Sequence, residues 1–170
     1  MDQSRKTTHL HLRRVVWEDA GLLLQWRNDP TTRKASISNH KISTEEHREW
    51  LTGILSDKDK QLFIAQIGNS PVGTVRADRT ENGWELSWTI APEARGKGLG
   101  KEMVMTLADM IEAPIAARVK KENQASASIA RYAGMALTEE KEGVLIFQRG
   151  AQQGKASAPA PWSSRFHTCF

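Results

Sequence analysis

The chain has 170 residues, of which 39% are hydrophobic and 26% are charged. This length is enough for one domain with a substantial core and too short for two ordinary domains. Its 24 lysines and arginines only slightly outnumber its 20 acidic residues, and they are dispersed along the chain. Composition and charge therefore favour a single globular domain and give no indication of a nucleic-acid partner.

The only cysteine, Cys169, is the penultimate residue. An internal disulfide is therefore excluded, and neither a thiol metal ligand nor a catalytic thiol is expected in the core. No run of residues approaches the roughly 18 apolar positions of a membrane span, and residues 1–14 lack the apolar stretch of a signal peptide. These features predict a cytoplasmic protein without a membrane partner.

The first forty residues predict a strand, a helix and a loop. Residues 9–13 alternate between polar and apolar, which is typical of a strand, and residues 17–28 carry apolar side chains at helical spacing. The Asp29-Pro30 pair ends this helix, because the residue before a proline avoids the α region. We expect a loop over residues 31–42.

A second helix and three strands follow. Ser43 and Glu46 form a capping-box pattern before an apolar stripe at helical spacing, which predicts the helix. The apolar period then changes to two. Residues 62–67, 72–79 and 84–90 are separated by the turns GNSP and TENG, and they predict an antiparallel meander.

The C-terminal part predicts a closing hairpin and a tail. A strand at 115–119 and a helix at 123–133 precede the hairpin, which spans 136–149 and turns at Glu142-Gly143. Residues 150–170 are rich in Ala, Pro and Ser, and such a segment cannot bury enough apolar surface to offset its ordering entropy. We therefore predict a domain at 1–149 and a flexible tail at 150–170.

Residues 91–103, APEARGKGLGKEM, connect the last meander strand to a further helix. The spacing does not fit a Walker loop, because Glu102 follows Gly100-Lys101, or a dinucleotide fingerprint, because Lys101 stands three residues after Gly98. Glycine-rich backbone at a helix N-terminus presents unpaired amides that favour a diphosphate. On spacing alone, the alternative is a glycine-rich connection with solvated lysines.

Two motifs together resemble the Gcn5-related N-acetyltransferases (GNAT). Arg95, Gly98 and Gly100 fill the acetyl-CoA-binding pattern of that family, and Asn123 and Ser126 fill its later Asn-x-x-Ser pattern. The resemblance covers about residues 8–149. It implies an α/β (mixed α+β) single domain, in which a mostly antiparallel central sheet is flanked by helices and splayed at the cofactor site.

The resemblance also implies acetyl-CoA as the cofactor, with no metal. The pantetheine arm would pair with the strand at 84–90, and the diphosphate would bind the glycine loop. Asn123 and Ser126 would lie near the arm, and Arg131 near the adenosine. The implied cofactor-binding residues are Trp88, Thr89, Ile90, Arg95, Gly96, Lys97, Gly98, Leu99, Gly100, Lys101, Asn123, Ser126 and Arg131.

The implied reaction is direct attack of an amine on the thioester, since the only thiol lies in the predicted tail. The oxyanion donor would be a main-chain N–H near Thr89 or Ile90. Ala130 stands where the family often has a tyrosine acid. Tyr132 lies about 200° further around the helix, so it cannot simply take that place. Solvent, or a water held by Ser126, is the alternative source of the proton.

Glu85 is the candidate base, because strand alternation puts it on one face with Ser87 and Thr89. A solvated strand glutamate would give the same pattern. His40, His47, or water acting on an amine of low pKa are the alternatives. The candidate catalytic residues are Glu85, Thr89, Ser126 and Tyr132.

Residues 24–51 resemble the GNAT branch that acetylates amino groups on nucleotide-linked sugars, in which Trp-Arg-Asn-Asp-Pro and His-x-x-Trp recur. Arg27 or Arg33 would meet the nucleotide diphosphate through paired hydrogen bonds. Core packing is the better explanation of Trp26 and Trp50. The candidate substrate-binding residues are Trp26, Arg27, Asn28, Arg33, His40 and His47.

We therefore expect an N-acetyltransferase acting on the primary amine of a small molecule, with an amino-sugar nucleotide as the best candidate. Ribosomal-protein N-terminal acetyltransferases resemble the same opening region and form the first alternative. Because Ala130 replaces the usual tyrosine, an acetyl-CoA-binding module without turnover is the second. The sequence leaves a homodimer open.

Overall fold

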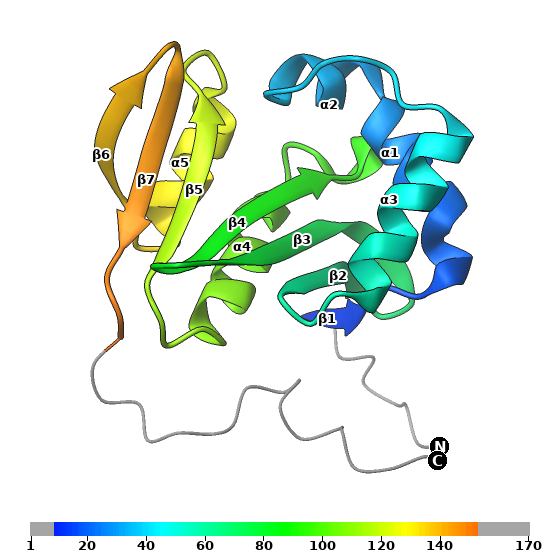
Figure 1. Ribbon diagram of the computed structural model, residues 1–170, viewed down its shortest axis with the longest axis horizontal. Coiled ribbons are helices and arrows are strands. Elements are labelled where there is room, and N and C mark those ends of the chain that lie inside the picture. The colour runs from blue at the N-terminus through cyan, green and yellow to red at the C-terminus, as the bar shows by residue number, and fades with distance from the viewer. Residues whose placement is uncertain (1–8, 153–170) are drawn as a thin grey trace, which may run out of the picture.

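The structure is a computed structural model that describes residues 9–152, so the tail predicted at 150–170 lies almost wholly outside it. Seven strands form one sheet in the order β1-β2-β3-β4-β5-β7-β6 (Figure 1). Only β4 and β5 run parallel, and the other neighbouring pairs are antiparallel. The predicted mixed, mostly antiparallel sheet is confirmed. The strands are β1 (Leu10–Arg14), β2 (Lys60–Ile67), β3 (Ser70–Thr80), β4 (Gly83–Ile90), β5 (Ile115–Lys120), β6 (Ala136–Lys141) and β7 (Val144–Arg149).

The α-helices follow the predicted order with one addition, and a short 3₁₀ segment lies in the loop after the last meander strand. The first helix ends at Asn28 as expected, but residues 30–35 form a further helix where the prediction had a loop. The side chain of Asp29 accepts a hydrogen bond from the N–H of Thr32 at 2.9 Å, and Pro30 occupies the first helical position, where an N–H is not needed. The helical segments are η1 (Trp17–Asp19), α1 (Ala20–Asn28), α2 (Pro30–Ala35), α3 (Thr44–Ser56), η2 (Pro92–Ala94), α4 (Leu99–Asp109) and α5 (Gln124–Tyr132).

Helices cover both faces of the sheet. On one face α4 packs against β1, β3 and β4, and α5 packs against α4 and the strands β5 to β7. On the other face α1 packs against β4, and α3 packs against β2. The core between these layers includes the fully buried side chains of Leu51, Ile64, Met103, Leu107 and Phe147.

The sheet opens between its two parallel strands. Only three residue pairs join β4 to β5, and the last of them is Leu86 with Ala117. Beyond this pair β4 continues to Ile90 and β5 to Lys120 without pairing to each other. The predicted splay is therefore present, and in Figure 1 the two strands diverge toward the end of the molecule where α2 lies.

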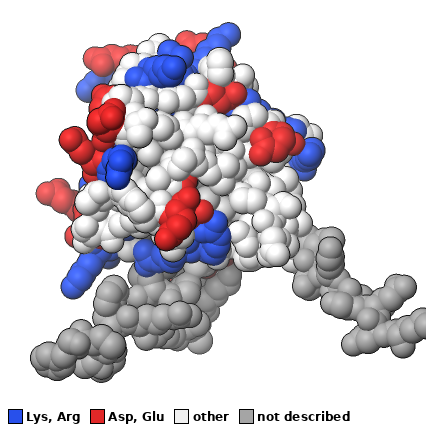
Figure 2. Space-filling view, turned by 90° about the vertical axis from the view of Figure 1, so that its right-hand side faces the viewer, with Lys and Arg blue, Asp and Glu red and all other residues white. Residues whose placement is uncertain are grey.

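The side of the molecule formed by α1 and α3 has an uncharged centre, with charged side chains mostly toward its edges (Figure 2). On α3 itself, Trp50 and Leu55 are exposed at 38% and 44%, although most of the apolar stripe of that helix faces the core. Within residues 9–152, no helix is long and apolar enough to cross a bilayer.

Candidate active site

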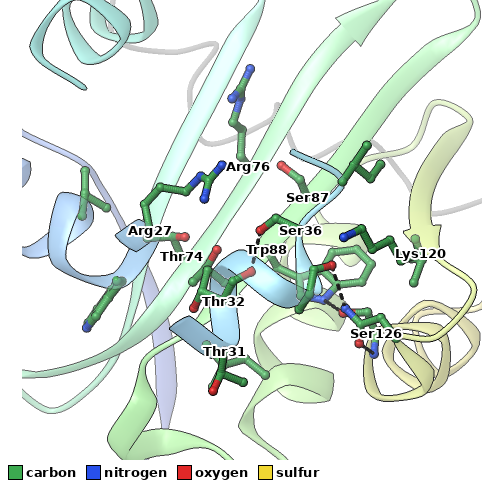
Figure 3. Close-up of a pocket in the computed structure, with 18 of the residues that line it drawn as sticks. Arg27, Thr31, Thr32, Ser36, Thr74, Arg76, Ser87, Trp88, Lys120 and Ser126 are labelled. Atoms are coloured by element: carbon green, nitrogen blue, oxygen red, sulfur yellow. Dashed lines mark hydrogen bonds between the residues drawn. The ribbon is translucent and has the colours of Figure 1, made fainter. Parts of the chain in front are cut away.

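A cavity of about 690 Å³ opens at the splay and is lined by residues of β3, β4, β5 and the helices α1, α2, α3 and α5. Thr74 and Arg76 of β3 and Ser87 of β4 lie on one side of α2, and Lys120 and Ser126 lie on the other (Figure 3). One cavity thus joins the splay, where the cofactor was expected, to the first helices, where the substrate was expected.

The glycine loop presents main-chain amides that have no acceptor. Gly96 and Gly98 adopt φ angles of 73° and 75°, a left-handed conformation that a side chain would strain. Gly98 caps α4 without a side-chain bond, and within residues 9–152 no group accepts from the N–H groups of residues 96–100. A Cβ on Gly100 would come within 2.5 Å of the Ile90 side chain, so α4 begins close against β4. This turn fits a diphosphate.

The free edge of β4 points further N–H groups into the splay. Trp84 donates its N–H to the carbonyl of Pro114 at 2.9 Å, on the side of β5. Because strand backbone alternates with a period of two, the N–H groups of Trp88 and Ile90 point the same way, beyond the last β4–β5 pair. The N–H of Thr89 points toward β3 instead. Of the two expected oxyanion donors, Ile90 is the one whose main chain faces the splay.

Three of the expected cofactor residues form a link across the splay. The Nε1 of Trp88 donates to the Oγ of Ser126 at 3.2 Å. The N–H of Ser126 donates to the Oδ1 of Asn123 at 3.0 Å, and this side chain caps α5. Asn123 also donates from Nδ2 to the carbonyl of Ala35 at 3.3 Å. The edge of β4 is thus joined to α5 and to the end of α2.

Most charged groups on the sheet side of the cavity are paired. Arg118 Nη2 lies 2.9 Å from Glu85 Oε1, and Arg76 contacts Asp78 through two nitrogens. The expected base Glu85 lines the cavity as the partner of Arg118, and both contacts from Arg118 go to its Oε1. The other lining carboxylate, Glu46, is held in the capping box of α3. Neither lining carboxylate is therefore without a partner.

Arg27 and Lys120 also line the cavity, and among residues 9–152 neither has a carboxylate partner. Arg27 Nη2 donates to the carbonyl of Ser38 at 2.8 Å, and Lys120 Nζ to the carbonyl of Lys34 at 3.1 Å. The Nη1 of Arg27 is buried with no hydrogen-bond partner. Burial, and then the charge of Arg33, lowers the pKa of Arg27. An anion would satisfy this buried donor.

Both expected histidines line the cavity. His47 is 3% exposed and stacks on Trp50 with ring centroids 5.3 Å apart. Burial lowers the pKa of His47, and a backbone hydrogen bond with Ala20 opposes that effect. His40 is exposed, with Nδ1 2.8 Å from the Oγ of Ser38. Within residues 9–152 no group of three or more His, Cys, Asp or Glu side chains could hold a metal ion.

Several expected cofactor and catalytic residues do not line the cavity. Tyr132 is 54% exposed, and the Nζ of Lys101 lies 5.6 Å from its ring centroid. Arg131 lies over the ring of Phe147, and Lys97 donates to a nearby carbonyl at 2.8 Å. Tyr132 therefore lies on the outer surface of α5, away from the splay, and it has no place in the proposed proton transfers.

Two expected substrate residues support the loop between α2 and α3 and do not line the cavity. Asn28 exchanges two hydrogen bonds of 2.8 Å with the main chain of Ile42. Arg33 donates from Nε to the carbonyl of Asn39 at 3.0 Å. Trp26, which does line the cavity, is 2% exposed, as expected for a core side chain. Core packing was also expected for Trp50, and there it is wrong, because this side chain is 38% exposed and lines the cavity.

The sequence reasoning missed Gly73 on β3. A Cβ at this position would lie 2.5 Å from the carbonyl oxygen of Thr89 and 3.0 Å from the Sδ of Met103. Only glycine therefore lets β3 and α4 pack this closely against the end of β4, at Thr89 and Ile90. A glycine inside a strand pattern was the available signal, because it often marks such a close approach.

A family model described as an acetyltransferase (GNAT) domain matches residues 9–136 of the chain. Among curated proteins, no significant match is found.

Solved structures share the fold at low sequence identity. One is a spermidine N-acetyltransferase from Vibrio cholerae in complex with CoA and spermine (TM-score 0.70, 16% identity, 82% of this chain and 92% of that chain). A second is an acetyltransferase from Salmonella typhimurium with its cofactor acetyl-CoA (TM-score 0.69, 16% identity, 86% of this chain and 96% of that chain). A third is a ribosomal-protein-alanine N-acetyltransferase from Brucella melitensis (TM-score 0.68, 22% identity, 82% of this chain and 98% of that chain).

Proposed function

We propose that this chain, which belongs to the GNAT acetyltransferase family, transfers the acetyl group of acetyl-CoA directly to the primary amine of an amino sugar linked to a nucleotide. Family membership makes the chain an N-acetyltransferase that uses acetyl-CoA. The acceptor is the new element of the proposal. Its main support is the pair Arg27 and Lys120, two cavity cations without a carboxylate partner among residues 9–152.

The residues of the chain divide the work of the reaction. The amides of residues 96–100 would hold the diphosphate of acetyl-CoA, and the N–H of Ile90 would donate to the thioester carbonyl oxygen. Acetyl-CoA supplies an acetyl group activated as a thioester. The amine nitrogen bonds to its carbonyl carbon as the carbon–sulfur bond breaks, the nitrogen loses a proton to water, and water protonates the thiolate.

The charge of the cavity suits an acceptor that carries both an amine and an anion. A nearby positive charge disfavours the protonated form of a bound amine, so the field of Arg27 promotes the neutral nucleophile. The same field attracts a diphosphate, because Arg27 lines the cavity in which that anion would bind. A polyamine carries several positive charges, which the cavity cations Arg27 and Lys120 would repel.

A melting experiment followed by an acceptor screen tests the proposal. Acetyl-CoA at 100 times its dissociation constant should stabilise the protein by about 2.7 kcal/mol. Release of free CoA is then measured with nucleoside-diphosphate amino sugars, the same amino sugars without the nucleotide, and spermidine. We expect turnover with the first group only. Fast turnover of spermidine would contradict the proposed acceptor class.

Acetylation of ribosomal-protein N-termini is the second candidate. It is favoured by the exposed Ile37 and His40, which line the cavity from an open loop where a peptide could enter. Ribosomal-protein N-terminal peptides therefore belong in the same screen, and their turnover in place of sugars would establish this alternative. Stabilisation by acetyl-CoA without CoA release from any amine would instead indicate a binding module.

A further inference from the structure

α2 spans the open end of the splay and is tied to the side formed by β5 and α5. The carbonyls of its last two residues, Lys34 and Ala35, accept hydrogen bonds from Lys120 and Asn123. In Figure 3, Thr31 and Thr32 of α2 and the following Ser36 lie between the two walls of the cavity. This short helix therefore closes the cavity where the two parallel strands diverge.

The other end of α2 is tied to the glycine loop. Arg95 directly precedes Gly96, yet its side chain turns away from the loop amides, and its Nη2 contacts Asp29 Oδ2 and Thr32 Oγ1. The Arg95 and Asp29 side chains are 31% and 19% exposed, so the ion pair is partly shielded from water. The hydrogen bond from Arg95, followed by that from the Thr32 N–H, lowers the pKa of Asp29. The residue that opens the diphosphate turn thus also holds the start of α2.

We propose that Arg95 is a positioning residue that couples the cofactor turn to α2, so that filling the turn completes the acceptor side of the cavity. This inference rests on the proposed function in one respect, the binding of the acetyl-CoA diphosphate at the glycine loop. It adds a named contact, that of Arg95 with Asp29 and Thr32, through which the filled turn would order the start of α2.

Two properties of the chain support this coupling. A helix of six residues is too short to be stable on its own, so α2 depends on its contacts at both ends. A turn with two glycines at positive φ has many conformations available when nothing is bound to it. A diphosphate that fixes the turn therefore fixes Arg95, and with it Asp29 and Thr32. By linkage, an acceptor that favours the ordered α2 strengthens cofactor binding by the same factor.

Hydrogen–deuterium exchange with CoA as the probe tests the coupling without any acceptor. In the wild-type protein, CoA should slow amide exchange in residues 30–36 by about 5-fold or more, the lower end of usual coupling strengths. In Arg95→Ala, CoA should still bind, because main-chain amides hold its diphosphate, but exchange in residues 30–36 should no longer respond to it. Arg79→Ala, an exposed arginine of β3 outside the cavity, is the matched control and should behave as wild type.

Two gentler variants separate coupling from general damage to the fold. Thr32→Val removes the hydroxyl that Arg95 contacts and keeps the shape of the side chain, and Thr32→Ser restores the hydroxyl. The response of residues 30–36 to CoA should weaken in the valine variant and return in the serine variant.

Each outcome has a defined meaning. If CoA binds the wild-type protein and residues 30–36 exchange at the same rate with and without it, the coupling is wrong while the acetyltransferase assignment stands. An unchanged CoA response in Arg95→Ala would overturn the role of Arg95. If CoA fails to bind the wild-type protein at all, the cofactor site itself is wrong, and the coupling fails with it.

Discussion

The two halves of the cavity are built from different parts of the chain. The cofactor half consists of the edge of β4 and the main-chain N–H groups of residues 96–100, of which Gly96 lines the cavity and the others continue from its rim into α4. The acceptor half consists of side chains brought together from distant segments, such as Arg27 of α1, Arg76 of β3 and Lys120 of β5. The cofactor half should therefore be sensitive to added atoms, and the acceptor half to changes of charge.

The largest expected effect is that of Gly73→Ala, on the cofactor half. The new Cβ would lie 2.5 Å from a backbone carbonyl of Thr89, which cannot move as a side chain can. We expect the free energy of unfolding to fall by about 2–3 kcal/mol, in the range of overpacked cores. Urea denaturation measures this loss. As a control, Gly53→Ala in α3, which has no atom within 4 Å of its Cβ position, should raise stability by about 0.5–1 kcal/mol.

Arg27→Ala should give the next largest effect, on the acceptor half. Loss of a charged hydrogen bond of about 1.5–3 kcal/mol predicts a fall of roughly 10- to 100-fold in kcat/KM for a nucleotide-linked amino sugar. The KM for acetyl-CoA should not change. Arg27→Lys keeps the charge but cannot make the paired hydrogen bonds, so its kcat/KM should lie between those of the wild type and Arg27→Ala. An unchanged kcat/KM for the nucleotide-linked sugar in Arg27→Ala would show that Arg27 does not bind the diphosphate.

A matched pair of glycine variants isolates the amide turn. Gly98 and Gly143 have φ angles of 75° and 76°, and neither has an atom within 4 Å of its Cβ position. Alanine at either site should cost about 1 kcal/mol of stability, because both force a side chain into the left-handed region. Only Gly98→Ala should also weaken CoA binding, by about 5-fold, as measured by calorimetry. Equal CoA affinities in the two variants would place the diphosphate elsewhere.

The difference between the halves explains what could be predicted from the sequence. Strand periodicity, the capping box of Ser43 and turn residues such as Gly143 act locally, so the element order and the mixed sheet could be predicted. The glycine loop could be found because its chemistry lies in consecutive main-chain atoms. The pairing of Glu85 with Arg118, 33 positions away, has no local signature, and neither does the exposure of Tyr132. Even α2 was missed, because Asp29-Pro30 ends one helix and begins another.

The smallest expected effect is a dependence of stability on pH that arises in the acceptor half. Burial lowers the pKa of His47 in the folded protein, whereas an unfolded histidine titrates near 6.5. The unfolded chain therefore binds a proton more readily. The contribution of His47 to the free energy of unfolding is therefore fully present above about pH 6.5. It is lost as the pH falls through the lower pKa of His47 in the folded protein.

Urea denaturation of the wild type and of His47→Gln between pH 5 and 8 measures this contribution. The wild type should lose stability toward pH 5 more steeply than the variant, whose side chain takes up no proton. Asp19 and Asp29, whose pKa values are also lowered, act at more acidic pH, because their unfolded values lie near 4. Gly98→Ala should keep the wild-type slope, since its change lies in the other half of the cavity. Parallel curves for wild type and His47→Gln would mean that His47 does not carry the pH dependence, and that the acceptor half holds no buried neutral imidazole.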